Sequence, residues 1–208
     1  MDYMVKPKFS FLRRLLFIIV LSSLMTCLSA VTVATADSKK TYKNRQYGFT
    51  LEYPSIYKLK TSGQVGFDLI REDRIILRAS IEDDAFKIFI KETESKENLF
   101  LDFARERAKV ICAADGPDGS TYCGAIEIEK QYTSTNGLNY LEFYSLMTRE
   151  DYSTETKHLS KVGPVYVVDI SREERPLALM IFPGYGKSAP TSTELMMKEM
   201  VDTIKLVP

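Results

Sequence analysis

The fold of this chain is decided by the stretch Tyr42-Lys-Asn-Arg-Gln-Tyr-Gly-Phe-Thr-Leu-Glu-Tyr-Pro54. Within it, Phe49 and Leu51 alternate with polar neighbours, which is the pattern of a β-strand that buries one face. Gly48 permits a turn directly before this strand, because glycine tolerates positive φ. Pro54 has no N–H group for a β-ladder and is expected to end the strand. The stretch therefore predicts a turn and then a strand whose apolar side chains enter a core.

Alternation of this kind continues through most of the chain. Asn136-Gly137 is the strongest short hairpin signal, because both residues tolerate the positive φ of a two-residue β-turn. Strands that are joined by such turns pair in the antiparallel sense. We expect further strands at residues 65–70, 75–81, 86–90, 125–129, 138–147, 165–170 and 177–182.

Two segments repeat instead with the period of an α-helix. Ser95 or Asn98 is expected to cap the first helix, and Thr191 with Glu194 forms a capping box that opens the second. The residues expected to face the core are Phe100, Phe103, Ala104, Arg107, Ala108 and Ile111, and then Met196, Met197, Met200, Val201 and Ile204. Hairpin-linked strands with two helices predict an α+β domain, an antiparallel β-sheet flanked by helices, over residues 42–208.

The pattern Tyr42-x-Asn44-x-x-Tyr47-Gly48-Phe49 and its continuation to Pro54 resembles the opening strand signature of the PsbP-like proteins. Residues 201–206 resemble the closing helix and short final strand of that family. The resemblance covers residues 42–207 and implies the fold that the family shares with the Ran-binding protein Mog1, an α-β-α sandwich. Named plant and cyanobacterial members assist photosystem II and its calcium, chloride and manganese chemistry. No metal-handling residue of those members is matched here, so the resemblance implies a fold and no activity.

Composition excludes some classes of function. The 208 residues are 45% hydrophobic and 27% charged, which is enough apolar mass for a core. Lys plus Arg and Asp plus Glu both number 28, so there is no positive surplus for a general nucleic-acid binder. The chain has one histidine, His158, which excludes multi-histidine metal sites. His158 lies in a polar stretch without a nucleophile signature, and no catalytic motif is found, so we do not expect an enzyme.

The first 36 residues have the organisation of a secretory signal peptide. A basic head that ends at Arg14 precedes an apolar run, and the small residues Ala34 and Ala36 fit a cleavage site after Ala36. Residues 37–41 form a polar lead. Removing residues 1–36 takes four basic residues and one acidic residue away, which leaves 24 basic against 27 acidic. The mature chain is then mildly acidic.

Three alternatives remain open at this leader. The uncharged run of 22 residues from Leu15 to Ala36 is long enough to remain as an uncleaved membrane anchor. Leu24-Met-Thr-Cys27 resembles a bacterial lipobox, in which the cysteine is lipidated, and cleavage after Ala30 would also fit. In every case residues 37–208 are expected outside the cytoplasm, in the periplasm or secreted, with membrane contact only through an uncleaved or lipidated N-terminus.

Cys112 and Cys123 are the cysteines that remain after the leader. In an oxidising compartment they are expected to form a disulfide, which stabilises by roughly 3 kcal/mol in the chain-entropy model. The loop between them carries Asp115 and Asp118 among turn residues. Carboxylate and backbone oxygens are the ligands that calcium prefers, although a rigid surface turn uses the same residues. Calcium is the only cofactor that the sequence suggests.

Aromatic residues gather around the Asn136-Gly137 hairpin. Tyrosines are good interface anchors because they bury area and keep a polar tip, and they are also ordinary residues of antiparallel sheets. As a possible surface for a protein partner we single out Tyr132, Tyr140, Tyr144 and Tyr152.

The sequence thus predicts an exported, non-catalytic PsbP-like domain. Its expected role is to bind a protein partner, whose identity the sequence does not give, in the periplasm or cell envelope. The alternative is a module that binds calcium or a small ligand with the loop of residues 112–123. A third hypothesis is an enzyme that uses carboxylates alone, but no sequence motif supports it.

Overall fold

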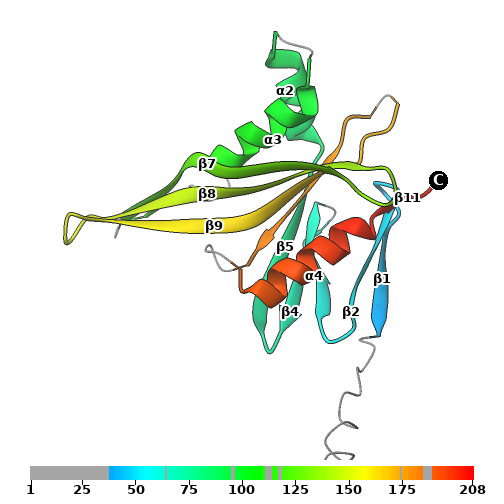
Figure 1. Ribbon diagram of the computed structural model, residues 1–208, viewed down its shortest axis with the longest axis horizontal. Helices are drawn as coiled ribbons and strands as arrows, with labels where there is room; N and C mark the ends of the chain where they lie inside the picture. Colours follow the sequence, from blue (N-terminus) through cyan, green and yellow to red (C-terminus); the bar gives the residue numbers. More distant parts are fainter. Residues whose placement is uncertain are drawn as a thin grey trace, which may run out of the picture. The chain divides into compact units, whose positions relative to one another are not determined.

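The alternating segments pair into one large antiparallel β-sheet (Figure 1). The computed structural model describes residues 38–208, apart from residues 64, 95–96, 111–113, 117–118, 174 and 185–188. The leader lies outside the described residues, so its cleavage stays a prediction. The spatial order of the strands is β3 (Lys58–Thr61), β4 (Gly66–Arg71), β5 (Arg74–Glu82), β10 (Ala178–Pro183), β9 (Thr156–Asp169), β8 (Asn139–Asp151), β7 (Gly119–Thr133) and β6 (Ala114–Gly116).

Six of the seven further strands expected from alternation are present, and those expected at residues 125–129, 138–147 and 165–170 form parts of the much longer β7, β8 and β9. The expectation of a strand at residues 86–90 is wrong, because α2 (Asp84–Glu92) occupies this segment. Phe86, Phe89 and Ile90 follow helical spacing and pack into a core, whereas Ile88 points outward and is 52% exposed. The Lys87 ammonium also pairs with the Asp83 carboxylate one helical turn earlier, at 2.5 Å.

Two other helices lie where the sequence predicts them, at α3 (Leu99–Val110) and α4 (Thr191–Asp202). Asn98 directly precedes α3 with a positive φ of 57°, whereas Ser95 lies outside the described residues. All the α4 residues expected to face inward are buried. No described helix is long and apolar enough to cross a bilayer.

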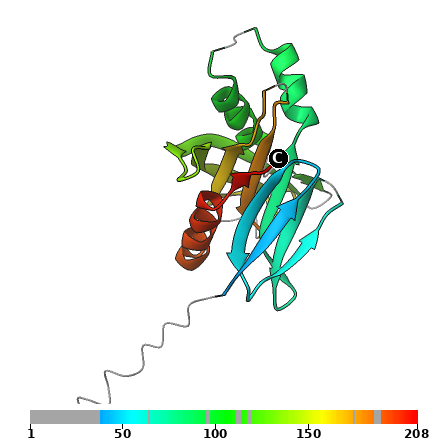
Figure 2. The ribbon, with the colours of Figure 1, turned by 90° about the vertical axis from the view of Figure 1, so that its right-hand side faces the viewer.

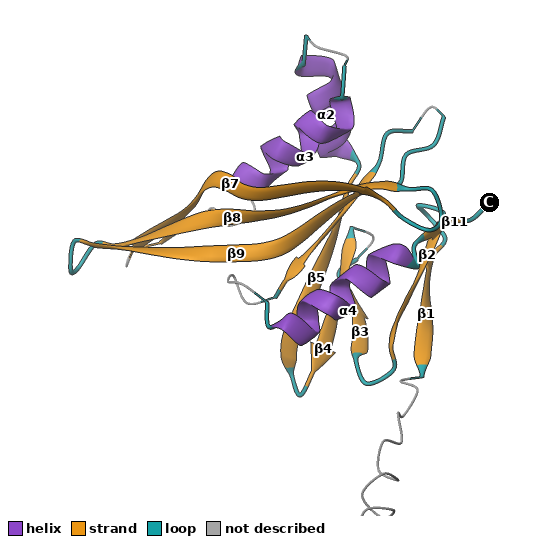
Figure 3. Cartoon of the chain, viewed as in Figure 1, coloured by secondary structure: helices purple, strands orange, loops and turns teal. Residues whose placement is uncertain are grey.

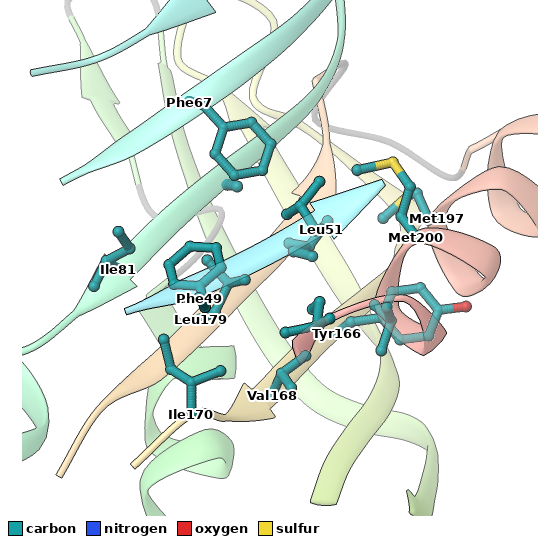
Figure 4. Packing of buried hydrophobic residues seen from close by; sticks show 14 of the residues in the cluster. Phe49, Leu51, Phe67, Ile81, Tyr166, Val168, Ile170, Leu179, Met197 and Met200 are labelled. Carbon is teal, nitrogen blue, oxygen red and sulfur yellow. The ribbon is translucent and has the colours of Figure 1, made fainter. Parts of the chain in front are cut away.

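The large sheet lies between α4 on one side and α2 with α3 on the other (Figure 3), and an apolar core fills the space on each face. On one face α2 and α3 pack against it, and Phe86 stacks on Phe103 with ring centroids 4.4 Å apart. On the other face α4 contributes Met197 and Met200 to a larger core (Figure 4). Alternation produces this division, because successive side chains of β8 and β9 point to opposite faces. The expected α-β-α layering is therefore confirmed.

A second, three-stranded sheet completes the α4 side (Figure 2). It consists of β1 (Lys39–Asn44), β2 (Phe49–Pro54) and β11 (Lys205–Leu206). Gly48 forms the turn before β2 with a φ of 65°, and Phe49 and Leu51 are fully buried, as the opening stretch predicts. β1 begins at Lys39, so part of the expected polar lead is a paired strand.

The predicted hairpin at Asn136-Gly137 joins β7 to β8. Gly137 has a φ of 80°, and its N–H donates to the carbonyl of Ser134. The Asn136 amide has a second role, since Nδ2 donates to the carbonyl oxygens of Asp202 at 2.9 Å and Ile204 at 3.1 Å. The turn therefore also satisfies carbonyl groups at the end of α4.

Candidate functional site

Three strands project from the body of the large sheet as an arm (Figures 1 and 3). β7, β8 and β9 are 15, 13 and 14 residues long, and in the figures they continue beyond the ends of α3 and α4. We define the arm as residues 119–123, 145–151 and 156–162. Short strands are common in compact domains, so this length is a specific feature of the chain.

A line of β-bulges marks the base of the arm. The ladder between β7 and β8 is irregular on both sides of Ile126, and the ladder between β8 and β9 is irregular next to Ser145. Ile126 pairs with Ser145, which in turn pairs with Val162, so the irregularities lie at one level across all three strands. Bulges bend a strand and increase its twist. The arm therefore leaves the body of the sheet along this line.

β9 loses its neighbour β10 at the same level. The last β9–β10 pair is Tyr166 with Ile181, and the same register would place Pro183 opposite Pro164. Neither proline has an N–H group, so the ladder ends there. Among the described residues, no strand pairs with the outer edge of β9 over residues 156–162. The arm thus presents an edge strand.

The base of the arm is tied to α4. The Tyr144 hydroxyl donates to the Glu194 carboxylate at 2.5 Å, and the Lys161 ammonium lies 4.5 Å from the centre of the Tyr144 ring. Burial and then the hydrogen bond to Glu194 raise the pKa of Tyr144.

The capping box predicted for Thr191 and Glu194 does not form, although α4 begins at the predicted residue. Pro190 occupies the N-cap position of α4 without a side-chain hydrogen bond, and Glu194 binds the sheet instead.

An apolar row crosses the arm. Tyr122 pairs with Thr148, and Thr148 pairs with Leu159, so these three residues lie side by side on three strands. Thr148 is buried between them, whereas Tyr122 is 42% and Leu159 is 72% exposed. Apolar side chains with this exposure are typical of contact surfaces when they gather on one element. The sequence analysis missed this row, because Leu159 stands alone among polar residues and Tyr122 lies outside the expected strands.

Charged residues flank the row. The Tyr122 hydroxyl donates to Glu150 at 3.3 Å, and the Lys157 ammonium pairs with the same carboxylate at 2.5 Å. These contacts with Lys157 and Tyr122 lower the pKa of Glu150. His158 is exposed on the arm, with Nε2 3.3 Å from the Thr156 hydroxyl.

The structure does not assemble the predicted tyrosine surface. Tyr140 is only 3% exposed and stacks on Tyr132 with ring centroids 5.2 Å apart, so the expectation of an open surface is wrong for Tyr140. Burial raises the pKa of Tyr140 to about 12. Tyr132 and Tyr144 are half-buried, and both make contacts with α4. Tyr152 is 54% exposed at the tip of the arm, in the turn between β8 and β9.

The loop of the cysteine pair is described only in part. Cys112 and Asp118 lie outside the described residues, and Cys123 lies on β7, within the arm. Asp115 belongs to β6, where its backbone pairs with Ser120. No group of three potential metal-ligating side chains occurs among the described residues. The disulfide and the calcium site both stay predictions.

Two hollows lie on the α3 side of the sheet. A polar one of about 460 Å³ is bordered by the first turn of α3 and includes the Asp169 carboxylate, which accepts a hydrogen bond from the Ser171 N–H at 3.0 Å. A more apolar one of about 550 Å³ lies between α2 and α3. Its wall includes Arg107, which pairs with the buried Glu82 at 3.1 Å. In both hollows these ionised groups already have partners within the fold.

The described elements define an α+β domain whose antiparallel sheet separates α4 from α2 and α3. This is the Mog1/PsbP-like fold. Cyanobacterial PsbP (CyanoP) from Synechocystis sp. PCC 6803 superposes with a TM-score of 0.50 at 12% identity, over 85% of this chain and 97% of that one. The Ran-binding protein Mog1p of Saccharomyces cerevisiae gives 0.42 at 9% identity, over 82% of this chain and 96% of that one.

No family model matches the sequence, and no curated protein matches it either. At these identities the likeness to solved structures establishes the fold alone. The superposition on cyanobacterial PsbP therefore confirms, at the level of the fold, the resemblance that the sequence shows at Tyr42–Pro54.

Proposed function

We propose that this protein is an exported, non-catalytic PsbP-like domain that binds a protein partner in the periplasm or cell envelope. The observation that supports the proposal is the arm, which extends three long strands beyond the helices and exposes Tyr122 and Leu159 across its width. Aromatic and large apolar side chains on a projecting element favour contact with another macromolecule.

The N-terminal leader, residues 1–36, supports the proposed location outside the cytoplasm. Its basic head, apolar run and small residues before Asp37 fit a secretory signal peptide, and the mature chain would carry 24 basic against 27 acidic residues. A mildly acidic protein is not attracted to nucleic acid or to anionic lipid. We therefore propose that membrane contact, where it occurs, is made by an uncleaved or lipidated N-terminus.

Co-purification from the native envelope tests this function. The full-length protein, tagged at its C-terminus, is recovered after mild crosslinking, and we expect one stoichiometric protein partner. The variant Leu159→Arg should lose most of the partner, because a charge then replaces the most exposed apolar side chain of the arm. Ile88→Arg is the matched control, since Ile88 is exposed on α2, outside the arm.

The same preparation tests export. The intact mass should correspond to a chain that begins at Asp37, and the protein should fractionate outside the cytoplasm. Repeated recovery of the protein alone from crosslinked envelopes would contradict partner binding. A full-length chain in the cytoplasmic fraction would contradict export.

A further inference from the structure

The turn between β7 and β8 contains a dipeptide with a chemistry of its own. In Asn136-Gly137 the backbone nitrogen of Gly137 can attack the side-chain carbonyl carbon of Asn136, because glycine has no side chain that hinders the approach. We propose that Asn136 is a deamidation site that the docked end of α4 keeps inactive, and that its deamidation irreversibly removes the contact between this turn and the helix. This inference goes beyond the proposed function.

The reaction consumes only water. The Gly137 nitrogen forms a bond to Asn136 Cγ, the Cγ–Nδ2 bond breaks, and the amide nitrogen leaves as ammonia with the proton that Gly137 gives up. Water then opens the resulting five-membered succinimide at either carbonyl, which leaves aspartate or isoaspartate at position 136. A neutral amide thus becomes a carboxylate, and no oxidant, reductant or enzyme is required.

Hydrogen bonds engage both reacting groups. The N–H of Gly137, which has to lose its proton, donates to the Ser134 carbonyl at 2.9 Å. The Asn136 amide is the second reacting group, and its Nδ2 donates to the carbonyl oxygens of Asp202 at 2.9 Å and Ile204 at 3.1 Å. Ring closure therefore has to break the Gly137 bond and to release the Asn136 side chain from the end of α4.

The backbone conformation of the turn opposes ring closure as well. The bond from Gly137 to Ser134 joins the fourth residue of a β-turn to the first, and of the described residues 134–137 only Gly137 has a positive φ. This is the pattern of a type I turn, whose third residue has a ψ of about 0°. Ring closure instead needs the Cα–Cβ bond of Asn136 to eclipse the C–N bond to Gly137, which is a rotation away from that ψ.

Burial does not explain why the dipeptide would be unreactive. Asn136 and Gly137 are both exposed, and a Cβ atom added to Gly137 would meet no heavy atom of the described residues within 4 Å. Water and hydroxide therefore reach the dipeptide. Thr135 adds to the contact with α4, since its hydroxyl donates to the Asp202 carbonyl at 3.1 Å. The hydrogen bonds, and hence the position of α4, control the reaction.

The product cannot restore the contact. A carboxylate at position 136 has no N–H group to donate, and it would face the carbonyl oxygens of Asp202 and Ile204. The structure describes α4 over its whole length, and the last turn of this helix has no basic residue. A new negative charge at a helix C-terminus is unfavourable. Deamidation thus converts a contact that stabilises the end of α4 into a repulsive one.

Deamidation kinetics test the proposal on the purified protein. The folded protein and the same protein in guanidinium chloride are kept in one mildly alkaline buffer, and peptide mass spectrometry follows deamidation at Asn136. We expect the folded protein to react at least about tenfold more slowly, because several hydrogen bonds have to break first. Asn139, which lies in the same hairpin before Tyr140, should react slowly in both states. Equal rates at Asn136 in the two states would overturn the proposal.

Thr135→Val separates the role of α4 from that of the turn. It removes the hydroxyl that binds Asp202 and leaves Asn136-Gly137 unchanged. Deamidation of the folded variant should be about two- to tenfold faster than in the wild type, which is the range for the loss of one hydrogen bond. The rates in guanidinium chloride should not differ. Thr133→Val is the matched control, because this hydroxyl binds Asn139 within the hairpin. Equal rates for the two folded variants would overturn the role of α4.

The deamidated protein tests the structural consequence. Anion exchange separates it from the intact protein by its additional negative charge, and hydrogen exchange is then measured for both. The amides of Thr203 and Ile204 bond to carbonyl groups in the last turn of α4, so they should exchange faster after deamidation. The amide of Phe103 on α3 should be unaffected. Unchanged exchange at Thr203 and Ile204 would contradict the loss of the contact.

Discussion

The Tyr144 hydroxyl of β8 donates a 2.5 Å hydrogen bond to the Glu194 carboxylate of α4. Tyr144 lies at the β-bulge where the arm leaves the sheet, and Glu194 lies in the first turn of the helix that covers one face. Lys161 of β9 packs over the same tyrosine ring. The direction of the arm is thus tied to the body of the domain at one polar contact among three elements.

Removing this contact should lower the stability of the domain. We expect Tyr144→Phe to reduce the free energy of unfolding by about 1–3 kcal/mol, because a hydrogen bond to a charged group is lost and a half-buried carboxylate keeps fewer partners. Urea denaturation followed by circular dichroism measures the change. Glu194→Gln should cost a similar amount, whereas Glu199→Gln, at an exposed position of the same helix, should be close to neutral. Equal effects at residues 194 and 199 would contradict the assignment.

The contact between α3 and β7 should depend on pH. Arg105 donates to both oxygens of Glu129, at 2.6 and 3.1 Å, and this hydrogen bonding lowers the pKa of Glu129. A lowered carboxyl pKa contributes stability above the pH where a free glutamate titrates, about 4.3, and this stability is lost as the pH falls through the lowered pKa. The pair is largely solvent-accessible, so its contribution should be below about 1 kcal/mol.

Glu129→Gln tests this linkage. The variant should be slightly less stable than the wild type at pH 7, and the difference should shrink below about pH 4, where the wild-type carboxylate becomes protonated. Thermal unfolding over a pH series measures the difference. A gap that is constant down to pH 2 would mean that the carboxylate charge does not stabilise the α3–β7 contact.

The α2–α3 layer should depend on Phe103. This ring is buried and stacks on Phe86 at 4.4 Å, so Phe103→Ala should cost about 3–5 kcal/mol through lost burial and the cavity that remains. Ile88→Ala, at an exposed position of α2, should cost below about 0.5 kcal/mol. Chemical denaturation compares the two variants. A small effect at Phe103 would contradict the packing of this layer.

The Asn136 side chain should stabilise the end of α4. Asn136→Asp keeps a residue that suits the turn but removes the amide that donates to Asp202 and Ile204, and it adds a negative charge near a helix C-terminus. We expect a loss of about 1–2 kcal/mol in denaturant unfolding. Asn136→Gly is informative as well, because it keeps the turn conformation and loses only the amide. An unchanged midpoint for both variants would exclude this role.

Local sequence patterns predict those elements in which the residue types suit both the backbone conformation and the burial of each position. Phe49 and Leu51 alternate in a strand with one buried face, and Gly137 supplies the positive φ of its turn. Asn136 is not among the residues with positive φ, so the two-residue turn expected at Asn136-Gly137 is replaced by a longer connection from Ser134 to Leu138.

The segment at Phe86–Ile90 is a helix where alternation predicts a strand, because five residues rich in apolar side chains satisfy both periods. The segment forms a helix because Phe86, Phe89 and Ile90 then lie on one face and pack into the core on the α2–α3 side of the sheet. This core is formed by residues distant in the sequence, so the local pattern alone does not reveal it.

The arm could not be predicted from local pattern. β-Bulges around Ile126 and Ser145 interrupt alternation, so the sequence favours short strands where the structure has long ones. The exposure of Tyr140 and Leu159 could not be predicted from the local sequence either. Tyr140 is buried by α4 and Leu159 is left open by the early end of β10, and both facts depend on elements distant in the sequence.

Site-specific photo-crosslinking in the native envelope tests the central claim most directly. A photoreactive phenylalanine analogue replaces Leu159 on the arm in one strain and Ile88 on α2 in another, and irradiated cells are examined for covalent adducts. We expect one discrete protein adduct from position 159 and none from position 88. Adducts from position 88 alone, or no adduct from either position while the protein is present outside the cytoplasm, would contradict partner binding through the arm.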